Sequence, residues 1–425
     1  MLYYFPDFFR FLSMKLLLSF FILLSFSTYG KSLIEPTPVP DTEELDIKAI
    51  PFAFHSDMLK TTLGAAAVMK SAFQPQATLF SGGIYSSNNS WAWYGGAYNY
   101  QLPNVSQWLI NIDTLSAHYK QGFYYFVDDK ENPIANDAQR HILDAKQGFT
   151  RMYLQYVLPF GEGKKGAVAT LKNDISPEDL INVKDWSPDK SGITSITFTP
   201  FYQYLDFQQP VEQQITDVSQ GLEVEIDYDN RNSMTMPSEG FQLQTRVRKD
   251  WGSASRTGWT RIEAELSKFF NLGANKFFQQ QTIALNVLLA DTPSWNKTTN
   301  GKYKRPPNFD AVTLGGWDQL RGYDDGRFYG RSAISYSIEY RGILSWHPLS
   351  KLPVIKGYQM PWWQWVAFID AGQVSPNFSI KELHKNMHIS VGAGIRINIE
   401  GIVARLDYAK GGEDSQFRVI INQPF

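Results

Sequence analysis

The sequence predicts an all-β protein, and more specifically a transmembrane antiparallel β-barrel of about 16 strands. Aromatic residues make up 15% of the chain, a high share that suits the aromatic girdles of a membrane barrel. Many segments alternate apolar and polar residues, and several do so over the roughly 9–11 residues that a membrane-crossing strand needs. Strands of soluble proteins typically run about 5–6 residues. A soluble β-sandwich is the alternative, but the length and repetition of the alternation favour the barrel.

Charge and cysteine content exclude several classes of function. The chain has 40 Lys and Arg against 42 Asp and Glu, so it lacks the basic excess of nucleic-acid-binding proteins. It has 0 Cys, which excludes disulfides, thiol catalysis and cysteine-ligated metals. The 6 His are scattered, and no nucleophile elbow, P-loop or EF-hand spacing is present. We therefore expect no enzyme activity, no metal site, no cofactor and no nucleic-acid partner.

Residues 1–30 are predicted to be a secretory signal peptide. An apolar run from Leu16 to Phe26 follows Lys15 and ends in small or polar residues. Met14 is a candidate for the true start, because Lys15 would then lie in a short positive n-region. A single membrane anchor is the alternative, but the run is short for a helix that spans a bilayer.

Residues 31–56 are predicted to be a Pro-rich acidic linker, and residues 57–425 are predicted to form the barrel. The linker prediction depends on the stretch from Leu33 to Asp46, whose proline and carboxylate residues cannot pack a core. The range 57–425 has room for about 16 strands, joined by short turns at one end and longer loops at the other.

The alternation is clearest in four segments, each with one apolar and one polar face. A single alternating strand also fits a soluble sheet with one solvated face, so the repetition carries the argument. The last predicted strand, Gln416–Phe425, finishes on an aromatic residue. The four apolar sets are Ile334, Tyr336, Ile338 and Tyr340; Ile389, Val391, Ala393, Ile395, Ile397 and Ile399; Leu222, Val224, Ile226 and Tyr228; and Phe241, Leu243 and Val247.

The stretch between Asp291 and Arg331 is far longer than the usual connection of about 4–6 residues. It reads LGGWDQLRGY from Leu314 to Tyr323, then GRFYG ending at Gly330, and a strand containing EYR follows. This pattern resembles the long loop that is the hallmark of the BamA/TamA family, the bacterial surface antigen family of outer-membrane assembly and translocation factors. The resemblance implies that the loop folds back into the lumen of the barrel.

Further motifs in the family's order support the resemblance from Gly221 onward. Members of the family usually carry POTRA domains before the barrel, whereas the segment before the predicted barrel is too short to hold one. The motifs are YDNR from Tyr228 with GF from Gly240, FIDAGQV from Phe368, GAGIR from Gly392 and RLDYA from Arg405.

The resemblance implies a set of site residues in the loop. Because an arginine keeps its charge, Arg321 inside a barrel would need carboxylate partners. Glu339, on the polar face of its strand, and Asp370, at the family's lumen-facing acidic position, are the candidates that would anchor the loop. The alternative places Arg321 in a solvated loop. The other motif residues would permit a tight backbone path or pack the loop tip, and they are Gly315, Gly316, Gly322, Tyr323, Arg327, Phe328 and Gly330.

Gly392, Gly394 and the final Phe425 are predicted to mark the seam where the first and last strands meet. The glycine pair would make the closing strand thin or kinked, so that the first and last strands pair weakly and part sideways. A bulge without a gating role is the alternative.

The family resemblance implies an integral protein of the bacterial outer membrane that inserts or translocates polypeptides. Its expected partners are outer-membrane lipid, unfolded polypeptide clients and a separate periplasmic protein. A passive pore for small solutes or ions is one alternative, and a surface antigen or scaffold without a transport role is another.

Overall fold

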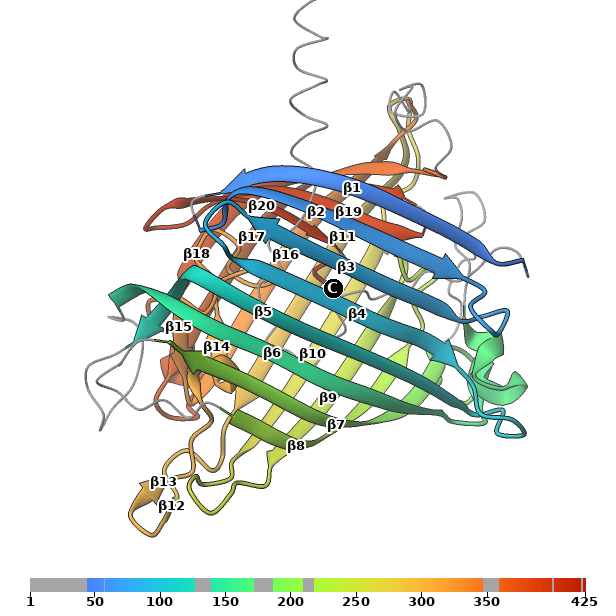
Figure 1. Cartoon of the computed structure of the whole chain (residues 1–425). Helices are drawn as coiled ribbons and strands as arrows, with labels where there is room; N and C mark the ends of the chain where they lie inside the picture. The colour runs from blue at the N-terminus through green and yellow to red at the C-terminus, as the bar shows by residue number, and fades with distance from the viewer. Residues whose placement is uncertain are drawn as a thin grey trace, which may run out of the picture.

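The protein is described from a computed structural model of the whole chain (Figure 1). The residues described are 44–56, 58–126, 139–171, 186–208, 218–346, 359–399, 401–421 and 423–425. The predicted signal peptide, residues 1–30, and the linker residues before Glu44 lie outside them. Among the described residues, no helix is long and apolar enough to cross a membrane.

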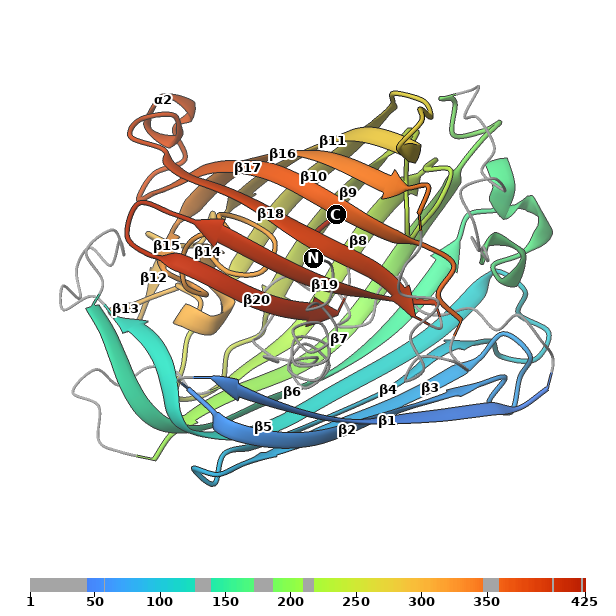
Figure 2. The same cartoon turned by 90° about the horizontal axis from the view of Figure 1, so that it is seen from above.

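One antiparallel sheet of 16 strands makes up the body of the protein, and its strands follow one another in chain order. The sheet curls around a lumen, as two perpendicular views show (Figures 1 and 2). The predicted barrel and its strand number are therefore confirmed. The strands are β1 (Asp46–Ser56), β2 (Lys60–Lys70), β3 (Thr78–Ser86), β4 (Trp91–Tyr100), β5 (Trp108–Phe126), β6 (Gln139–Val157), β7 (Ile193–Phe207), β8 (Val218–Asp229), β9 (Gly240–Asp250), β10 (Thr260–Asn271), β11 (Phe278–Asp291), β16 (Ser332–Leu344), β17 (Trp363–Ser375), β18 (His388–Ile399), β19 (Ile402–Lys410) and β20 (Ser415–Ile421).

Where the structure describes them, the connections contain only short elements. The stretch between β11 and β16, expected to lack strands, holds two small ladders. They are β12 (Thr298–Thr299) with β13 (Lys302–Tyr303), and β14 (Val312–Leu314) with β15 (Phe328–Gly330). The helical turns are η1 (Gly161–Lys165), η2 (Val168–Thr170), η4 (Asn308–Asp310) and α2 (Ile380–Leu383).

The predicted linker 31–56 extends too far into the chain, because Asp46–Ser56 forms the first strand, β1. This strand pairs along its whole length with β2, including Pro51 opposite Ala65. A proline donates no backbone hydrogen bond, and within sheets it is tolerated on edge strands. Strand β1 is such an edge, since β2 is its single neighbour in the sheet. The proline content that predicted a linker is therefore compatible with a terminal strand.

The predicted alternation divides the strands into a lumen face and an outer face. In β16, the outward Ile338 is 52% exposed, whereas the neighbouring Glu339 is 0% exposed inside the barrel. The same pattern holds in β18, where Val391 and Ile395 are exposed and Ser390 and Arg396 are buried. The outer face thus presents apolar side chains to lipid, and the lumen holds most of the charge.

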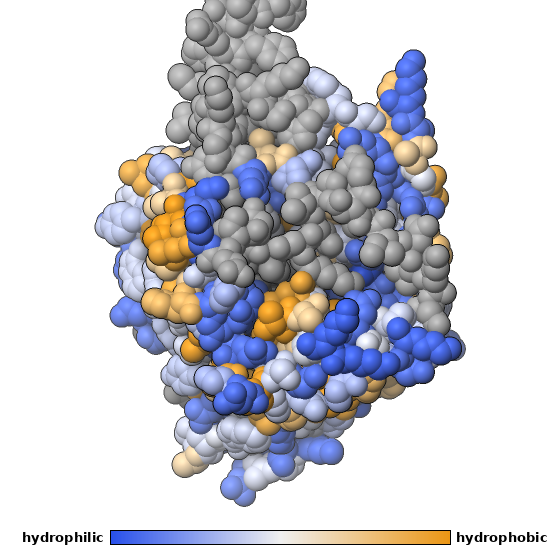
Figure 3. Space-filling view, turned by 90° about the vertical axis from the view of Figure 1, so that its right-hand side faces the viewer, coloured by the Kyte–Doolittle hydropathy of each residue, from blue (hydrophilic) through white to orange (hydrophobic). Residues whose placement is uncertain are grey.

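The two ends of the barrel differ. We call the end with the β11–β16 connection the loop end, and the opposite end, where β1 begins and β20 finishes, the base. Figure 3 views the base, where hydrophilic residues lie beside hydrophobic patches. At the loop end β5 and β6, of 19 residues each, run past their other neighbours, since the last β5 residue paired with β4 is His118.

The first and last strands are the two ends of the sheet, with no ladder between β1 and β20 among the described residues. Side-chain packing links the two sides of this seam at the base. Ile402, on the outward-facing set of β19, packs against an apolar cluster on the lumen face of β2–β6 that includes Val68 and Phe80. Apolar side-chain packing, and no backbone ladder among the described residues, therefore joins the last strands to the first ones here.

Candidate functional site

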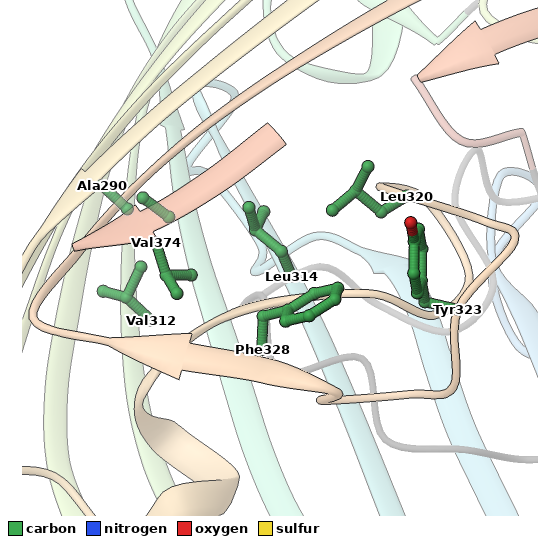
Figure 4. Packing of buried hydrophobic residues seen from close by; sticks show 8 residues of the cluster. Ala290, Val312, Leu314, Leu320, Tyr323, Phe328 and Val374 are labelled. Atoms are coloured by element: carbon green, nitrogen blue, oxygen red, sulfur yellow. The ribbon is translucent and has the colours of Figure 1, made fainter. Parts of the chain in front are cut away.

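The long loop, residues 292–331, lies against the inner wall through an apolar cluster (Figure 4). Its β14–β15 hairpin supplies Leu314 and Phe328, which face Val374 of β17 and Ala290 of β11. Leu320 is 0% exposed. A stretch with this much buried apolar surface has a defined place on the wall, because exposing it again would be unfavourable.

Arg321 lies in the lumen, where the structure brings it together with both predicted carboxylates. Its Nε and Nη2 donate to the two oxygens of Asp370 at 3.0 and 2.7 Å, and its backbone N–H donates to Asp370 Oδ2 at 3.0 Å. Its Nη1 lies 2.5 Å from Glu339 Oε1. Arg321 is 0% exposed, which excludes the solvated-loop alternative. A two-pronged contact of this kind fixes both distance and orientation.

The strand register explains why the two carboxylates meet at one arginine. Asp370 on β17 is directly opposite Ser337 on β16, and Glu339 is the next lumen-facing residue of β16. Ser337 Oγ donates to Asp370 Oδ1 at 2.7 Å and accepts from Arg321 Nη2 at 3.0 Å. The guanidinium also stacks on the ring of Phe368, 3.4 Å from its centroid. Every side of the buried charge therefore has a partner, as burial requires.

Glu339 is shared by three arginines, two of which were not identified from the sequence. Its Oε1 also accepts from Arg396 Nη2 at 2.8 Å, and its Oε2 accepts from Arg341 Nε at 2.7 Å. Arg396 and Arg341 are both buried. Both were visible as polar members of alternating strands, but the alternation does not say which lumen residues converge on one carboxylate.

The prediction for Gly392 and Gly394 is wrong, because both lie in β18, which is two strands away from the seam. A Cβ at Gly392 would lie 2.3 Å from the ring of Phe368, and one at Gly394 would lie 2.0 Å from Asp407 Oδ1. The glycines therefore leave room for the ring under Arg321 and for a third carboxylate near it. Asp407 Oδ2 lies 3.9 Å from Arg321 Nη1.

The placement of Phe425 differs from the prediction in a similar way. The last strand ends at Ile421, and Phe425 lies in the lumen near the base rather than at the seam. It packs with Phe269 of β10 and Ala284 of β11. Figures 1 and 2 both place the C-terminal end within the outline of the barrel.

The glycines of the loop motif permit its path. Gly315 and Gly316 have φ angles of 96° and 126°, which other residues rarely adopt. A Cβ at Gly322 would lie 2.4 Å from the backbone nitrogen of Gly411, so the loop passes close to the β19–β20 turn. Gly330 is the last residue of β15.

Aromatic and charged motif residues hold the loop tip to its neighbours. The hydroxyl of Tyr323 donates to the carbonyl of Ile389 at 3.3 Å and accepts from the Gly412 N–H at 2.9 Å. The ring of Phe328 stacks on His388, 3.9 Å between centroids. Arg327 Nη2 forms an ion pair with Glu413 Oε1 at 2.7 Å. Among these interactions the Arg327 pair is the most exposed, since Glu413 is 48% exposed.

A second buried anchor at Asp310 was not predicted. This residue of η4 is 0% exposed. Its Oδ1 lies 3.2 Å from Arg248 Nε on β9, and its carbonyl accepts from Arg261 Nη1 of β10 at 2.7 Å. Arg261 also pairs with Glu263 at 2.9 Å. No sequence signal pointed to Asp310, because it lies outside the recognised motif and in no alternating strand.

The described residues hold no group of His, Asp and Glu placed to bind a metal ion. The arrangement that they do form is mechanical: a loop with two charged anchors inside a barrel, and a seam without a ladder. The loop therefore occupies part of the lumen, and no ladder joins β1 to β20 among the described residues.

Comparisons with known proteins bear on the family and the fold. The Omp85 superfamily domain matches residues 178–425. No curated protein matches the sequence significantly. Among solved structures, CdiB from Escherichia coli is similar over 88% of this chain and 62% of its own, with 10% identity and a TM-score of 0.54. CdiB from Acinetobacter baumannii is similar over 88% and 59%, with 12% identity and a TM-score of 0.50.

The chain thus spans about three fifths of the length of these CdiB chains, 62% and 59%. A BamA structure from Haemophilus ducreyi lacking POTRA domains 1–3 is matched over 91% of this chain and 76% of that one, with 13% identity and a TM-score of 0.48. At these identities the structural likeness concerns the fold, whereas the domain match covers more than half of the sequence. The chain belongs to the Omp85 superfamily of integral outer-membrane β-barrels.

Proposed function

We propose that this protein inserts or translocates polypeptides at the bacterial outer membrane, and that clients pass between lumen and lipid at the seam between β1 and β20. The observation that carries the proposal is the unpaired seam beside a lumen that the long loop occupies. A plugged lumen suits an intermittent, client-driven opening better than a constant flow of small solutes.

Opening the barrel at the seam requires fewer backbone hydrogen bonds to break than opening it elsewhere. Separating two strands in the middle of the sheet exposes a full row of backbone N–H and C=O groups, each of which costs several kcal/mol in lipid. A contact across the seam that the structure shows is apolar packing around Ile402, and separating such packing costs less than breaking a ladder. The edges of β1 and β20 also offer backbone groups with which an extended client strand can pair.

The proposal assigns client capture to a separately encoded periplasmic protein. The described residues form the barrel and its connections, and they hold no folded unit beside it. The proposed activity needs no bond-making step, so it requires no catalytic residue or cofactor.

A reversible tie across the seam tests the proposal in a background of 0 native Cys. Cysteines at Ala49 or Ala53 of β1 are combined with cysteines at Phe417 or Val419 of β20, and the pair that oxidises is kept. Purified protein in lipid vesicles is mixed with a urea-unfolded eight-stranded barrel protein, whose folding is followed by heat-modifiable gel mobility. We expect the untied protein to accelerate folding, the oxidised tie to abolish the acceleration, and reductant to restore it.

The matched control ties strands that are already paired. Ala264→Cys with Leu289→Cys joins opposite residues of β10 and β11, and oxidation there should leave the acceleration unchanged. Equal acceleration with the seam tied would overturn the lateral route. Steady conductance in planar bilayers, without any acceleration of folding, would instead establish the passive pore.

A further inference from the structure

Two further segments lie against the lumen wall at the base. One is the turn between β8 and β9, whose Met236 is 1% exposed and packs on the lumen-facing Ile343 and Val403. The other is the segment Gln423–Phe425, whose Phe425 is 6% exposed. The two segments contact each other, since Gln423 Nε2 donates to the carbonyl of Thr235 at 2.9 Å. We call this pair of segments the base plug.

Phe425 occupies a defined seat on the wall. Its ring lies 6.4 Å from that of Phe269, with Ala284 beneath, and the guanidinium of Arg341 lies 4.8 Å from its centroid and 5.3 Å from that of Phe269. Arg341 Nη2 also donates to the carbonyl of Phe425 at 3.3 Å. One arginine therefore holds this residue by its ring and by its backbone.

The same arginine links the base plug to the loop. Arg341 Nε donates to Glu339 Oε2 at 2.7 Å, and Glu339 Oε1 accepts from Arg321 Nη1 at 2.5 Å. The chain of contacts runs from Phe425 through Arg341 and Glu339 to Arg321, and all three charged residues are buried. In a buried network of low dielectric, moving one member changes the energy of the others.

We propose that Gln423–Phe425 is a displaceable plug at the base of the lumen, and that its seating is coupled to the seating of the long loop through Glu339. When the loop withdraws Arg321, Glu339 loses one of its three cations and rearranges around Arg396 and Arg341. Arg341 then shifts, and the seat of Phe425 loosens. This coupling would open the lumen in the same way for a polypeptide and for a small solute.

Cysteine labelling of the seat tests the plug. Ala284 is 0% exposed under Phe425, so a single Ala284→Cys reports whether the seat is open. Detergent-folded protein, checked by heat-modifiable mobility, is treated with a small charged methanethiosulfonate reagent. We expect slow labelling at Ala284→Cys relative to the exposed turn position Lys276→Cys. Adding Arg341→Gln should raise the rate about fivefold or more, within the usual range of coupling between sites. Gln423→Ala should raise it without touching the charged network.

The coupling has its own readout. Glu339 does not contact Phe425, yet Glu339→Gln should also speed labelling at Ala284→Cys. The matched control is Asp113→Asn, which removes a buried carboxylate on β5 that is 3.0 Å from Arg151 and should leave the rate unchanged. Coupling between two sites is reciprocal. Val374→Cys, under the loop, reports the seating of the loop, and Arg341→Gln should speed its labelling. If Arg341→Gln fully unseats the base plug and Asp370→Asn fully unseats the loop, the factor should equal the one that Asp370→Asn produces at Ala284→Cys.

The outcomes separate the two parts of the proposal. If Ala284→Cys is labelled no faster in the presence of Arg341→Gln or of Gln423→Ala than without them, the displaceable plug is wrong. If they accelerate labelling but Glu339→Gln does not, the base plug stands and the coupling through Glu339 is wrong. If Asp113→Asn accelerates labelling as much as Glu339→Gln, general loosening of the barrel explains the result and the coupling is again wrong.

Discussion

The two walls of the lumen are built in different ways. The wall from β2 to β6 carries apolar and aromatic side chains, in clusters around Phe80, Tyr94 and Phe149 and around Ile84 and Tyr119. The wall from β8 to β19 carries networks of arginines and carboxylates. Both loop anchors with buried charges lie on the second wall, whereas β5 and β6 contact the loop through Tyr125 and Arg140.

The difference explains why the recognisable sequence lies in the second half. A buried charge needs a partner of the opposite sign at a fixed distance, so few residue types serve at each position. Apolar packing tolerates many substitutions if volume and pattern are kept. The domain match begins at residue 178 and leaves out β1 to β6, which include all the strands of the apolar wall.

Replacing Arg321 with Ala is expected to have the largest effect. The change leaves Asp370 buried with two serine hydroxyls and the backbone N–H of residue 321 as partners. Removing one partner of a buried ion pair typically costs about 3–5 kcal/mol. The free energy of unfolding, measured by urea titration with heat-modifiable mobility, should fall by that amount, and less folded protein should reach outer membranes. Arg321→Lys, which keeps the charge but loses the fork, should lose less. Unchanged stability and unchanged amounts in the membrane would contradict the anchor.

The second anchor is expected to contribute less, because its partners have other contacts. Asp310→Asn keeps the shape of the side chain, and Arg261 retains Glu263. The loss should be about 1.5–3 kcal/mol, the usual range for a hydrogen bond to a charged group. The same urea titration measures it. Asn308→Ala, in the same helical turn, removes a contact of 3.4 Å and is the matched control with little expected change. Equal effects of the two substitutions would show that Asp310 is no anchor.

The sequence predicted the parts of this structure that depend on local pattern. Alternation over strand lengths predicted the barrel, its strand number and the lumen-facing side of Glu339. The charge of Arg321 predicted that carboxylates would surround it if it was buried, and the motif named them. These inferences need only the period of a strand and the rule that buried charges are paired.

The parts that failed depend on pairings between distant segments. Asp310 meets Arg248 and Arg261 because the loop folds inward, and no spacing along the chain encodes that contact. Gly392 was interpreted from its own strand, whereas its role is to make room for Phe368 on the neighbouring one. Phe425 was expected to continue a strand, but its seat is made by β10, β11 and β16.

An exposed ion pair at the loop tip offers a smaller test. Arg327→Ala removes a contact with Glu413, which is 48% exposed, and such pairs typically contribute about 0–1 kcal/mol. We expect the urea midpoint to change little and any difference to disappear in high salt, which screens exposed charges. A loss as large as that of Arg321→Ala would mean that the tip, rather than the buried anchors, holds the loop.

The apolar wall supplies the test with the smallest expected effect. Its pair Asp113–Arg151, 3.0 Å apart, is buried among aromatic rings and holds no other described segment in place. Replacing both residues together, Asp113→Leu with Arg151→Met, should change the free energy of unfolding by less than about 1 kcal/mol, because apolar residues of similar volume often replace a buried pair without loss. Asp113→Leu alone leaves Arg151 uncompensated and should cost about 3–5 kcal/mol.

The corresponding double change Arg321→Met with Asp370→Leu should remain destabilising, since it also leaves Glu339 without one of its three cations. If both double changes are equally tolerated, the charges of the two walls have the same role, and the loop is held by its apolar cluster instead.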